Sequence, residues 1–420
     1  MFEQAYRRRI DADLARWQAD GTITGDAASA IRLALGPAPR GAGAAAVVGT
    51  VGGLLIVAAI LVFVAANWEV IPRPVRLALM IAGIAAAHGL GGMFARAGRG
   101  YLADACASFG AIIFGATVAL VGQMYHLPAD FSAGFLLWAL GALAGAVLTG
   151  SRGALAVALC AGAAWSVAVA LDLGISPHWA YLAFWLSGVA LAIAWDSPSA
   201  RHLAALSLVG WWIETAIGFD LDKWPGDFAF VAAVGASLML GAGLALECRG
   251  PPGMRRLGAT HASYGGLGIA FAVTLSVLGL TGLMAKGWPI WLVGSAGAGA
   301  ILAGLAALLS RRVGPALAAA AILLALATAM APDPDTTDSA RWTIYAFSLA
   351  SMLALLVSGA VDMVRPRLVA GWIGLGLVIA AITWRVEGEL LTRALFLACA
   401  GGAAILLAVG LGRLQPKEAR

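Results

Sequence analysis

Charged residues are scarce in this sequence. Only 12% of its 420 residues are Asp, Glu, Lys or Arg, whereas 61% are hydrophobic. Ordinary soluble domains carry roughly 25% charged residues. The composition therefore excludes a water-soluble fold of this size. The net charge of +5 comes from basic residues spread over many short segments. They form no basic tract of the kind that neutralises phosphates, so we expect no nucleic-acid partner.

Cysteine and the common catalytic motifs are also nearly absent. The four cysteines stand alone in or beside apolar segments, without a C-x-x-C spacing or a nearby His cluster. This argues against a disulfide framework and against a zinc site. A Gly-rich phosphate loop, a nucleophile elbow and paired carboxylates are missing as well. We therefore expect no metal, no cofactor and no catalytic residue, and a soluble type of enzyme is excluded.

What the sequence does contain is long apolar runs. Fourteen of them, most about 20 residues long, occur between Gly43 and Gly412. A run of this length crosses a hydrocarbon core of about 30 Å only as a helix. We therefore predict an all-α fold, a polytopic transmembrane helical bundle of about 14 spans, with 12 as the alternative if neighbouring spans merge. The predicted spans are 43–66, 75–94, 103–123, 131–149, 153–171, 178–195, 202–219, 227–247, 262–284, 288–309, 314–331, 341–361, 368–384 and 391–412.

The basic residues alternate between the connections of these spans. Most of the 27 Lys and Arg residues fall in the N-terminal segment and in every second connection after it. Short connections rich in Lys and Arg face the cytoplasm, so this pattern predicts that both termini are cytoplasmic. Tryptophans at the opposite, external ends of spans are expected to anchor the protein at the membrane interface. These are Trp68, Trp179, Trp224, Trp288, Trp342 and Trp384.

Residues 1–42 precede the first span and have the pattern of a helical hairpin. Gly21 is expected to end the first helix and Thr24 to cap the second. We therefore predict three parts: a cytoplasmic amphipathic hairpin at 1–42, a transmembrane domain at 43–412 and a cytoplasmic tail at 413–420. The hairpin could dock a cytoplasmic protein partner or anionic headgroups, or it could cap the protein's own cytoplasmic face. Its apolar positions at helical spacing are Phe2, Tyr6, Ile10, Leu14 and Trp17.

Ionisable side chains inside the predicted spans are rare, and each is a candidate site. Glu214 is the only acidic residue well inside a span, where an unpaired charge is costly. Its functional interpretation is a proton or cation site, or a polar anchor in an outward pocket. Its structural interpretation is an ion pair with Arg76 or Arg393, or a carboxylate that reaches water. His88 lies near the middle of the second span. It predicts either a hydrogen-bonded helix contact or a proton relay.

Two external connections concentrate polar side chains. The candidate residues are Asn67, Trp68 and Arg76 in the first connection, and Gln123, Tyr125, His126 and Asp130 in the second. Each connection mixes an aromatic residue, a proline and hydrogen-bonding groups at the outer membrane surface. They could line a pocket for a headgroup, a sugar or an extended peptide. Alternatively, they are ordered hairpin turns with interfacial residues.

The same segments carry a resemblance to a known family. The matching residues are Trp17, Gly21, Ile23, Ala27 and Ile31, then Asn67-Trp68, Ile71-Pro72 and Arg76-Leu77, and finally Tyr125-His126, Pro128 and Asp130. Over roughly residues 8–150, the chain resembles the predicted bacterial membrane proteins called domain of unknown function 2157. The resemblance implies a helical membrane fold in a bacterial inner membrane. The family has no established activity, so the resemblance implies no reaction.

Three functions remain open from the sequence. The first is transport or flipping of a small or lipid-linked solute through an outward-facing pocket, with Glu214, His88 and Gln123 as binding or coupling residues. Spans with small-residue interfaces can move against one another around such a pocket. The second is a non-catalytic membrane scaffold or envelope sensor that acts through the N-terminal hairpin. The third is a membrane enzyme acting on a lipid-linked substrate. Membrane lipids are expected partners in every case.

Overall fold

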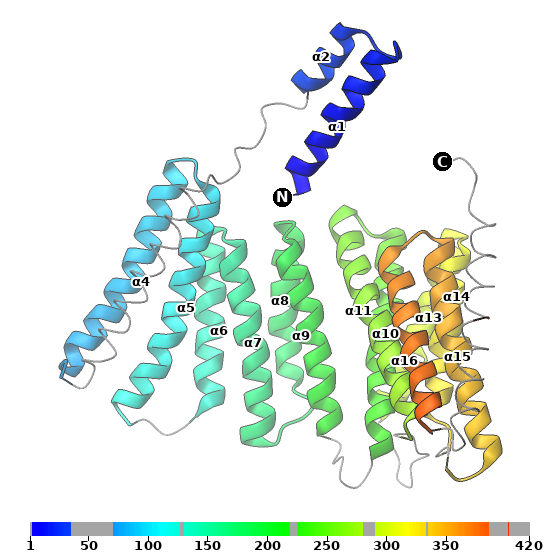
Figure 1. Cartoon of the computed structure of the whole chain (residues 1–420). Coiled ribbons are helices and arrows are strands. Elements are labelled where there is room, and N and C mark those ends of the chain that lie inside the picture. Colours follow the sequence, from blue (N-terminus) through cyan, green and yellow to red (C-terminus); the bar gives the residue numbers. More distant parts are fainter. Residues whose placement is uncertain are drawn as a thin grey trace. The chain divides into compact units, whose positions relative to one another are not determined.

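The structure, a computed structural model (Figure 1), describes residues 2–34, 70–126, 130–218, 225–279, 290–332 and 335–385, together with residue 402. All regular elements within these ranges are α-helices, which confirms the predicted all-α class. The chain divides into two compact units, residues 1–76 and residues 77–420.

The first unit contains the N-terminal hairpin, formed by α1 (Phe2–Ala19) and α2 (Gly25–Ala34). Gly21 has a left-handed φ of 71° between the two helices, a conformation that glycine adopts without steric cost. The Ala27 N–H donates to Thr24 Oγ1 at 3.2 Å. Gly21 and Thr24 therefore end the first helix and cap the second as predicted. Leu14 is buried, whereas Trp17 remains exposed.

The helices after the hairpin follow one another along the chain. They are α4 (Arg73–Arg96), α5 (Gly100–Met124), α6 (Phe131–Thr149), α7 (Arg152–Leu173), α8 (Trp179–Ala194), α9 (Pro198–Ile217), α10 (Pro225–Arg249), α11 (Pro252–Val277), α12 (Ile290–Ala296), α13 (Ala298–Ser310), α14 (Val313–Ala329), α15 (Asp338–Val361) and α16 (Arg365–Arg385). Most of them coincide with a predicted span to within a few residues. Helix α11 does not, because it begins ten residues before the predicted span 262–284 and ends seven residues before its end. Helices α12 and α13 share the span 288–309, which is interrupted at Gly297. The predicted span 43–66 lies outside the described residues, and so does the span 391–412 apart from residue 402.

Length and composition identify which of these helices can cross a bilayer. Within the described ranges, eight helical segments are long and apolar enough to do so, and α8 and α14 are apolar but shorter. Helix α9 is less apolar because it contains Arg201, His202 and Glu214. The fold is therefore that of a polytopic helical membrane protein.

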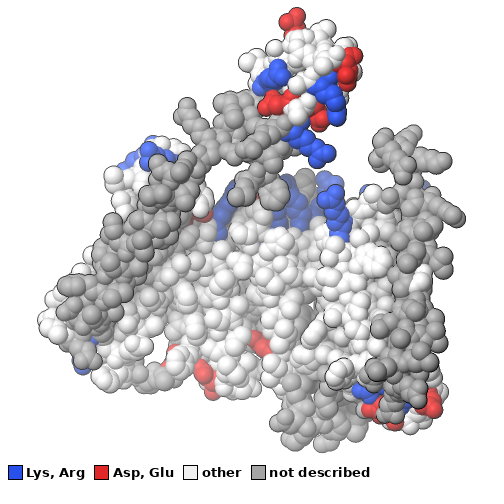
Figure 2. Space-filling model, in the orientation of Figure 1, with Lys and Arg blue, Asp and Glu red and all other residues white. Residues whose placement is uncertain are grey.

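Arginines gather at one end of the helices in the second unit, and acidic side chains are visible at the other end (Figure 2). We call the first the arginine-rich end. Its arginines are Arg96, Arg99, Arg152, Arg201, Arg249, Arg255, Arg256, Arg311, Arg312, Arg365 and Arg367. The alternation of basic connections along the sequence thus corresponds to a charge difference between the two ends of the bundle.

Side-chain caps fix where several helices begin. Ser151 Oγ accepts the Ala154 N–H at 3.0 Å at the start of α7. Asp104, in the second turn of α5, reaches the same point. Its Oδ1 accepts from Ser151 Oγ at 2.7 Å and from the Gly153 N–H at 3.1 Å. Asp104 therefore fastens the first turn of α7 to α5 and satisfies a backbone N–H that the helix leaves unpaired.

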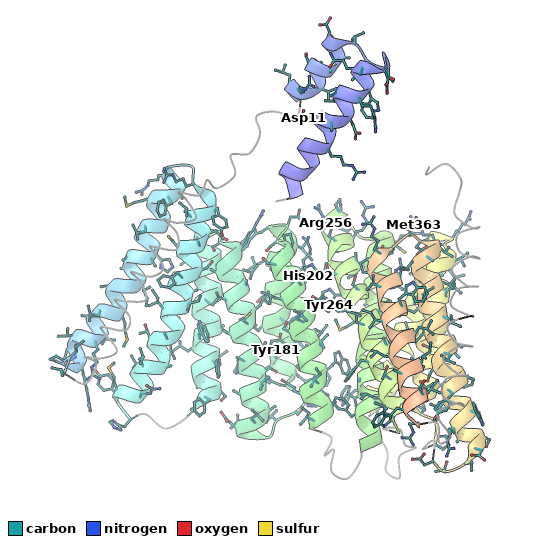
Figure 3. All side chains as sticks on the ribbon, in the orientation of Figure 1. Asp11, Tyr181, His202, Arg256, Tyr264 and Met363 are labelled. Atoms are coloured by element: carbon teal, nitrogen blue, oxygen red, sulfur yellow. The ribbon has the colours of Figure 1, made fainter. Side chains whose placement is uncertain are left out.

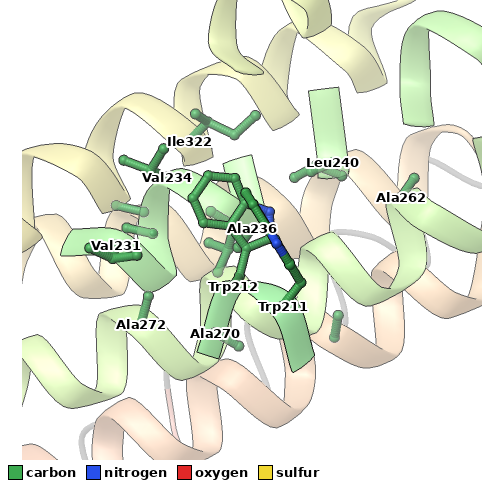
Figure 4. Packing of buried hydrophobic residues seen from close by; sticks show 14 of the residues in the cluster. Trp211, Trp212, Val231, Val234, Ala236, Leu240, Ala262, Ala270, Ala272 and Ile322 are labelled. Carbon is green, nitrogen blue, oxygen red and sulfur yellow. The ribbon is translucent and has the colours of Figure 1, made fainter. Parts of the chain in front are cut away.

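Small residues allow the helices α10 to α16 to approach closely. A Cβ atom on Gly241 of α10 would lie 2.0 Å from the Gly299 carbonyl oxygen of α13, so the two backbones touch there. At another point on α10, a Cβ atom on Gly235 would lie 2.5 Å from the Trp212 ring of α9. Figure 4 shows Trp211 and Trp212 at Ala236 of α10.

A buried ionic cluster joins α10, α14, α15 and α16 near the arginine-rich end. Arg367 is 2% exposed, and its Nη1 lies 3.0 Å from Asp362 Oδ2, while its Nη2 lies 3.9 Å from Glu247 Oε1. Arg367 also donates to Ser358 Oγ at 3.0 Å, and Ser358 Oγ donates to the Gly314 carbonyl oxygen at 2.7 Å. The sequence analysis counted Arg367 only among the basic residues of a connection and did not predict its burial.

Candidate functional site

The α5–α6 hairpin brings together three of the residues singled out in the sequence. Helix α5 ends before Tyr125, and His126 follows with a left-handed φ of 51°. Helix α6 begins after Asp130, which is its N-cap residue. Gln123 lies in the last turn of α5. The end of one helix and the start of the next therefore hold Gln123, His126 and Asp130 at the same end of the hairpin.

These three side chains line a cavity of about 540 Å³ between α5 and α6, here called the α5–α6 cavity. Its other lining residues are Gly115, Val118, Ala119 and Gly122 from α5, and Phe131, Gly134, Phe135 and Trp138 from α6. Pockets for small ligands measure roughly 300–1,000 Å³ and combine apolar walls with a few polar groups. The α5–α6 cavity has this size and this composition.

Aromatic side chains form the wall of the cavity away from its polar residues. Trp138 Nε1 donates to the Ala111 carbonyl oxygen of α5 at 3.0 Å. A Cβ atom on Gly115 would lie 2.2 Å from the Trp138 ring, so only glycine leaves room for the indole there. The Phe135 ring is stacked on Trp138, with 6.2 Å between ring centroids. The indole is thus held against α5 by its hydrogen bond and by its neighbours.

Asp130 carries a negative charge to the polar end of the cavity. Its Oδ1 accepts from the Ala133 N–H at 2.8 Å and from Ser132 Oγ at 2.8 Å. These two hydrogen bonds hold the pKa of Asp130 below its usual range, the Ala133 N–H most strongly, so the carboxylate is ionised at neutral pH. Both of these hydrogen bonds, which come from described residues, are accepted by Oδ1 of Asp130. Oδ2 is left to accept from a ligand.

The chemistry of this end is that of a hydroxyl- or amine-binding site. The Gln123 amide can donate and accept, a His126 ring nitrogen can do either, and the Asp130 carboxylate accepts. All three side chains are exposed. A ligand can therefore reach them without first displacing protein atoms.

Glu214 belongs to a different, buried cluster. It is 7% exposed, and its Oε1 accepts from Ser166 Oγ of α7 at 2.7 Å. The Ser166 hydroxyl lies 3.2 Å from His178 Nδ1, and the His178 ring meets the Trp165 ring edge-on at 4.6 Å. Among the described residues of the second unit, Glu214 forms no ion pair, and its Oε2 has no hydrogen-bond partner. Arg393, one of the two expected partners, lies outside the described residues.

His88 is a partly buried contact between helices. Its Nδ1 lies 2.9 Å from the Ile84 carbonyl oxygen. A Cβ atom on Gly110 would lie 2.4 Å from the His88 ring, which shows that the imidazole packs directly on α5. This geometry favours the hydrogen-bonded helix contact over the proton relay. His88 does not line the α5–α6 cavity.

The remaining candidate residues do not join the cavity. Tyr125 is half exposed and is not among the lining residues. Arg76 belongs to the first unit, where its Nε donates to the Ile71 carbonyl oxygen at 2.7 Å. Asn67 and Trp68 lie outside the described residues. The sequence analysis had not singled out Trp138, Ser166 or His178, because the groups that they contact lie elsewhere in the chain.

The apolar helices, their small-residue contacts and the charge difference between their ends define a multi-pass membrane protein. Residues 15–155 match the family described as predicted membrane protein (DUF2157), which confirms the resemblance seen in the sequence. This segment contains α4, α5, α6 and all lining residues of the α5–α6 cavity. The comparison with curated proteins found no match, and neither did the comparison with solved structures.

Proposed function

We propose that this protein binds a small polar or lipid-linked solute in the α5–α6 cavity and moves it across a bacterial inner membrane. One observation carries the proposal: Gln123, His126 and Asp130 line a single cavity of ligand size. With the arginine-rich end on the cytoplasmic side, as the positive-inside rule requires, both termini are cytoplasmic and the cavity opens outward.

The lining suits a molecule with a polar head and an apolar body. Exposed donors and acceptors at the mouth match hydroxyl, amine or amide groups, and Phe135 and Trp138 match a sugar face or a hydrocarbon chain. A lipid-linked solute combines both parts. Its chain would remain among the helices while its head occupies the polar end.

The two helices that form the cavity bury few of their residues inside the protein, which supports movement. In the most apolar 18-residue stretches of α5 and α6, 22% of the residues are buried, whereas 72% are buried in the corresponding stretch of α10. Helices with few buried contacts shift at a low free-energy cost. Glu214 does not line this cavity, and so we assign solute binding to Gln123, His126 and Asp130 instead.

Proteoliposomes provide the test. The full chain is reconstituted with phosphatidylglycerol that carries a nitrobenzoxadiazole label, and dithionite is added outside to quench the accessible label. We expect the protein to accelerate the loss of inner-leaflet fluorescence. Because Gln123→Ala and His126→Ala each remove one hydrogen-bonding group, each should slow this phase about fivefold. Tyr125→Ala is the matched control, since Tyr125 is exposed on the same hairpin but does not line the cavity.

Two outcomes would contradict the proposal. If proteoliposomes behave like protein-free vesicles, the protein does not flip this lipid class. If Gln123→Ala and His126→Ala both match the wild type, solute does not pass through the α5–α6 cavity.

A scaffold or sensor function is the second proposal, because the N-terminal hairpin exposes Trp17 and Leu33 as apolar groups that a partner could cover. The same vesicles separate the two proposals. A chain without residues 1–42 should keep its flipping rate if the cavity is the working site.

A further inference from the structure

A second cavity, distinct from the α5–α6 cavity, is lined by tryptophan. It measures about 440 Å³ and lies between α8 and α9 on one side and α10, α11 and α12 on the other. Five of the 15 tryptophans of the chain line it, namely Trp179, Trp185, Trp211, Trp212 and Trp291. No lining residue is shared with the α5–α6 cavity. We call it the tryptophan cavity.

The tryptophan side chains are held in place by backbone and ring contacts. Trp211 Nε1 donates to the His178 carbonyl oxygen at 3.0 Å, and Trp185 Nε1 donates to the Ala204 carbonyl oxygen at 2.8 Å. The Trp179 ring meets the rings of Trp211 and Trp291 edge-on, at 5.5 Å and 5.2 Å. Because the N–H groups of Trp185 and Trp211 are already paired, these indoles offer apolar ring surface to the cavity. Trp179, expected as an interfacial anchor, also lines this cavity.

One buried polar side chain interrupts the apolar lining. His261 of α11 is 6% exposed and lines the cavity, with its ring 5.9 Å from the Trp185 ring. Its Nδ1 lies 3.0 Å from the Leu257 carbonyl oxygen. A carbonyl oxygen only accepts, so Nδ1 carries the hydrogen and Nε2 is an acceptor. Among the described residues, Nε2 has no hydrogen-bond partner.

A buried acceptor without a partner selects the ligand. Leaving such a group unpaired is unfavourable, and a ligand hydroxyl would remove the penalty. A hydrocarbon cannot donate to Nε2, and neither can an ester carbonyl or a carboxylate. Apart from His261 and Ser295, whose hydroxyl donates to the Leu292 carbonyl oxygen at 2.9 Å, the lining is apolar. Two of the surrounding segments, Phe228–Arg249 and Ile290–Ser310, are long and apolar enough to cross a bilayer, where hydrocarbon chains are the available molecules.

We propose that the tryptophan cavity binds a long-chain alcohol from the membrane. Its hydroxyl donates to His261 Nε2, and its hydrocarbon chain lies along the indole faces. A space of about 440 Å³ admits one chain with a small head but has no room for a full two-chain phospholipid. This site is separate from the solute site proposed above, so either proposal can fail without the other.

Photolabelling tests the proposal on the full chain in lipid nanodiscs. The probe is a sixteen-carbon alcohol with a mid-chain diazirine and a terminal alkyne, and peptide mass spectrometry locates the label. We expect labelling on α8 to α12. Hexadecanol should compete on the order of tenfold better than hexadecane, because only the alcohol satisfies His261.

Three variants separate ligand selection from simple space filling. His261→Phe keeps a ring of similar shape and should retain labelling while hexadecanol and hexadecane become equal competitors. Ala242→Phe places a ring in the cavity and should suppress labelling. Trp342→Phe, at an exposed tryptophan that does not line the cavity, should change nothing.

The proposal is overturned if the label maps outside the cavity, or if hexadecane already competes as well as hexadecanol in the wild type. The latter outcome would indicate an ordinary lipid chain in the cavity. Misfolding cannot imitate the expected result, because the His261→Phe variant must still bind the probe and lose only its preference for the alcohol.

Discussion

Helices α4 to α6 and helices α10 to α16 solve the problem of packing in a membrane differently. In the first region, only 17–22% of the residues in the most apolar 18-residue stretch of each helix are buried. Aromatic side chains such as Trp138 fill the space between these helices. In the second region the buried share is higher, at 44% for α16, 50% for α15 and 72% for α10, and α10 touches α13 through the backbones of Gly241 and Gly299. The first region leaves an open cavity, whereas the second is a dense framework.

The two regions also differ in how they accommodate polar groups. Gln123, His126 and Asp130 lie at the exposed end of a hairpin, where water satisfies them until a ligand does. Arg367 is buried and must be satisfied by Asp362 and Ser358. The polar groups at the exposed end of the α5–α6 hairpin are therefore available for binding, whereas Arg367 is committed to holding its helices together. Near the arginine-rich end, where Figure 3 labels Arg256, the guanidinium groups of Arg201 and Arg256 both pair with the carboxylate of Asp196, at 2.6 Å and 2.7 Å.

The largest expected loss of stability comes from a substitution in the buried ionic cluster that joins α10, α14, α15 and α16. Arg367→Met removes the cation from a buried cluster and leaves the carboxylates of Asp362 and Glu247 without it. Removing one partner of a buried ion pair costs about 3–5 kcal/mol. We expect a loss of unfolding free energy of this size, measured by denaturant titration in detergent micelles. Arg365→Met, two residues away and exposed, is the control and should change little.

A smaller loss of stability is expected when a single Cβ atom is added to α5 in the first region. Gly115→Ala would place a Cβ atom 2.2 Å from the Trp138 ring and force the indole to move. Overpacking of this kind costs about 1–3 kcal/mol. Gly122→Ala, on the same helix and lining the same cavity, meets no atom within 4 Å and should be neutral or slightly stabilising. Equal unfolding temperatures for the two variants would show that Trp138 does not lie against α5.

The smallest effect concerns the pH dependence of the α6 cap. The pKa of Asp130 is lowered in the folded protein, because the Ala133 N–H and the Ser132 hydroxyl donate to it. Its ionised form therefore adds stability above the unfolded pKa of about 3.9, and this contribution is lost as the pH falls through the folded pKa. Asp130→Asn keeps an accepting oxygen but cannot titrate. The wild type should lose its advantage over this variant below about pH 4 in thermal unfolding, and a constant difference down to lower pH would contradict the assignment.

The sequence predicted the helices well because their signals are local. Apolar runs, Gly21, Thr24 and the alternation of Arg residues each report on a few neighbouring positions, and they agree with the helices described. Gln123, His126 and Asp130 were found for the same reason, since all three belong to one short connection whose ends must meet.

The remaining sites depend on contacts between distant parts of the chain. Ser166 and Glu214 are 48 positions apart, and nothing in either segment indicates that a serine hydroxyl will satisfy that carboxylate. The tryptophan cavity requires side chains from five helices, and the sequence shows each tryptophan only as a membrane-interface residue or a bulky span residue. Arg367 resembled any other basic residue in a connection because burial is not visible in composition.

The contact between Asp104 and the first turn of α7 fixes the height over which α6 must run. Helices α5 and α7 start at the same end and are joined there by Asp104, so α6 must return over one fixed height, about 28 Å for its 19 residues. One extra residue within α6 would turn the rest of that helix by about 100°. Either the α7 attachment or the wall that carries Trp138 would then be out of register. A substitution at the rim of the cavity therefore leaves this height unchanged, whereas an insertion within α6 alters the depth of the whole cavity.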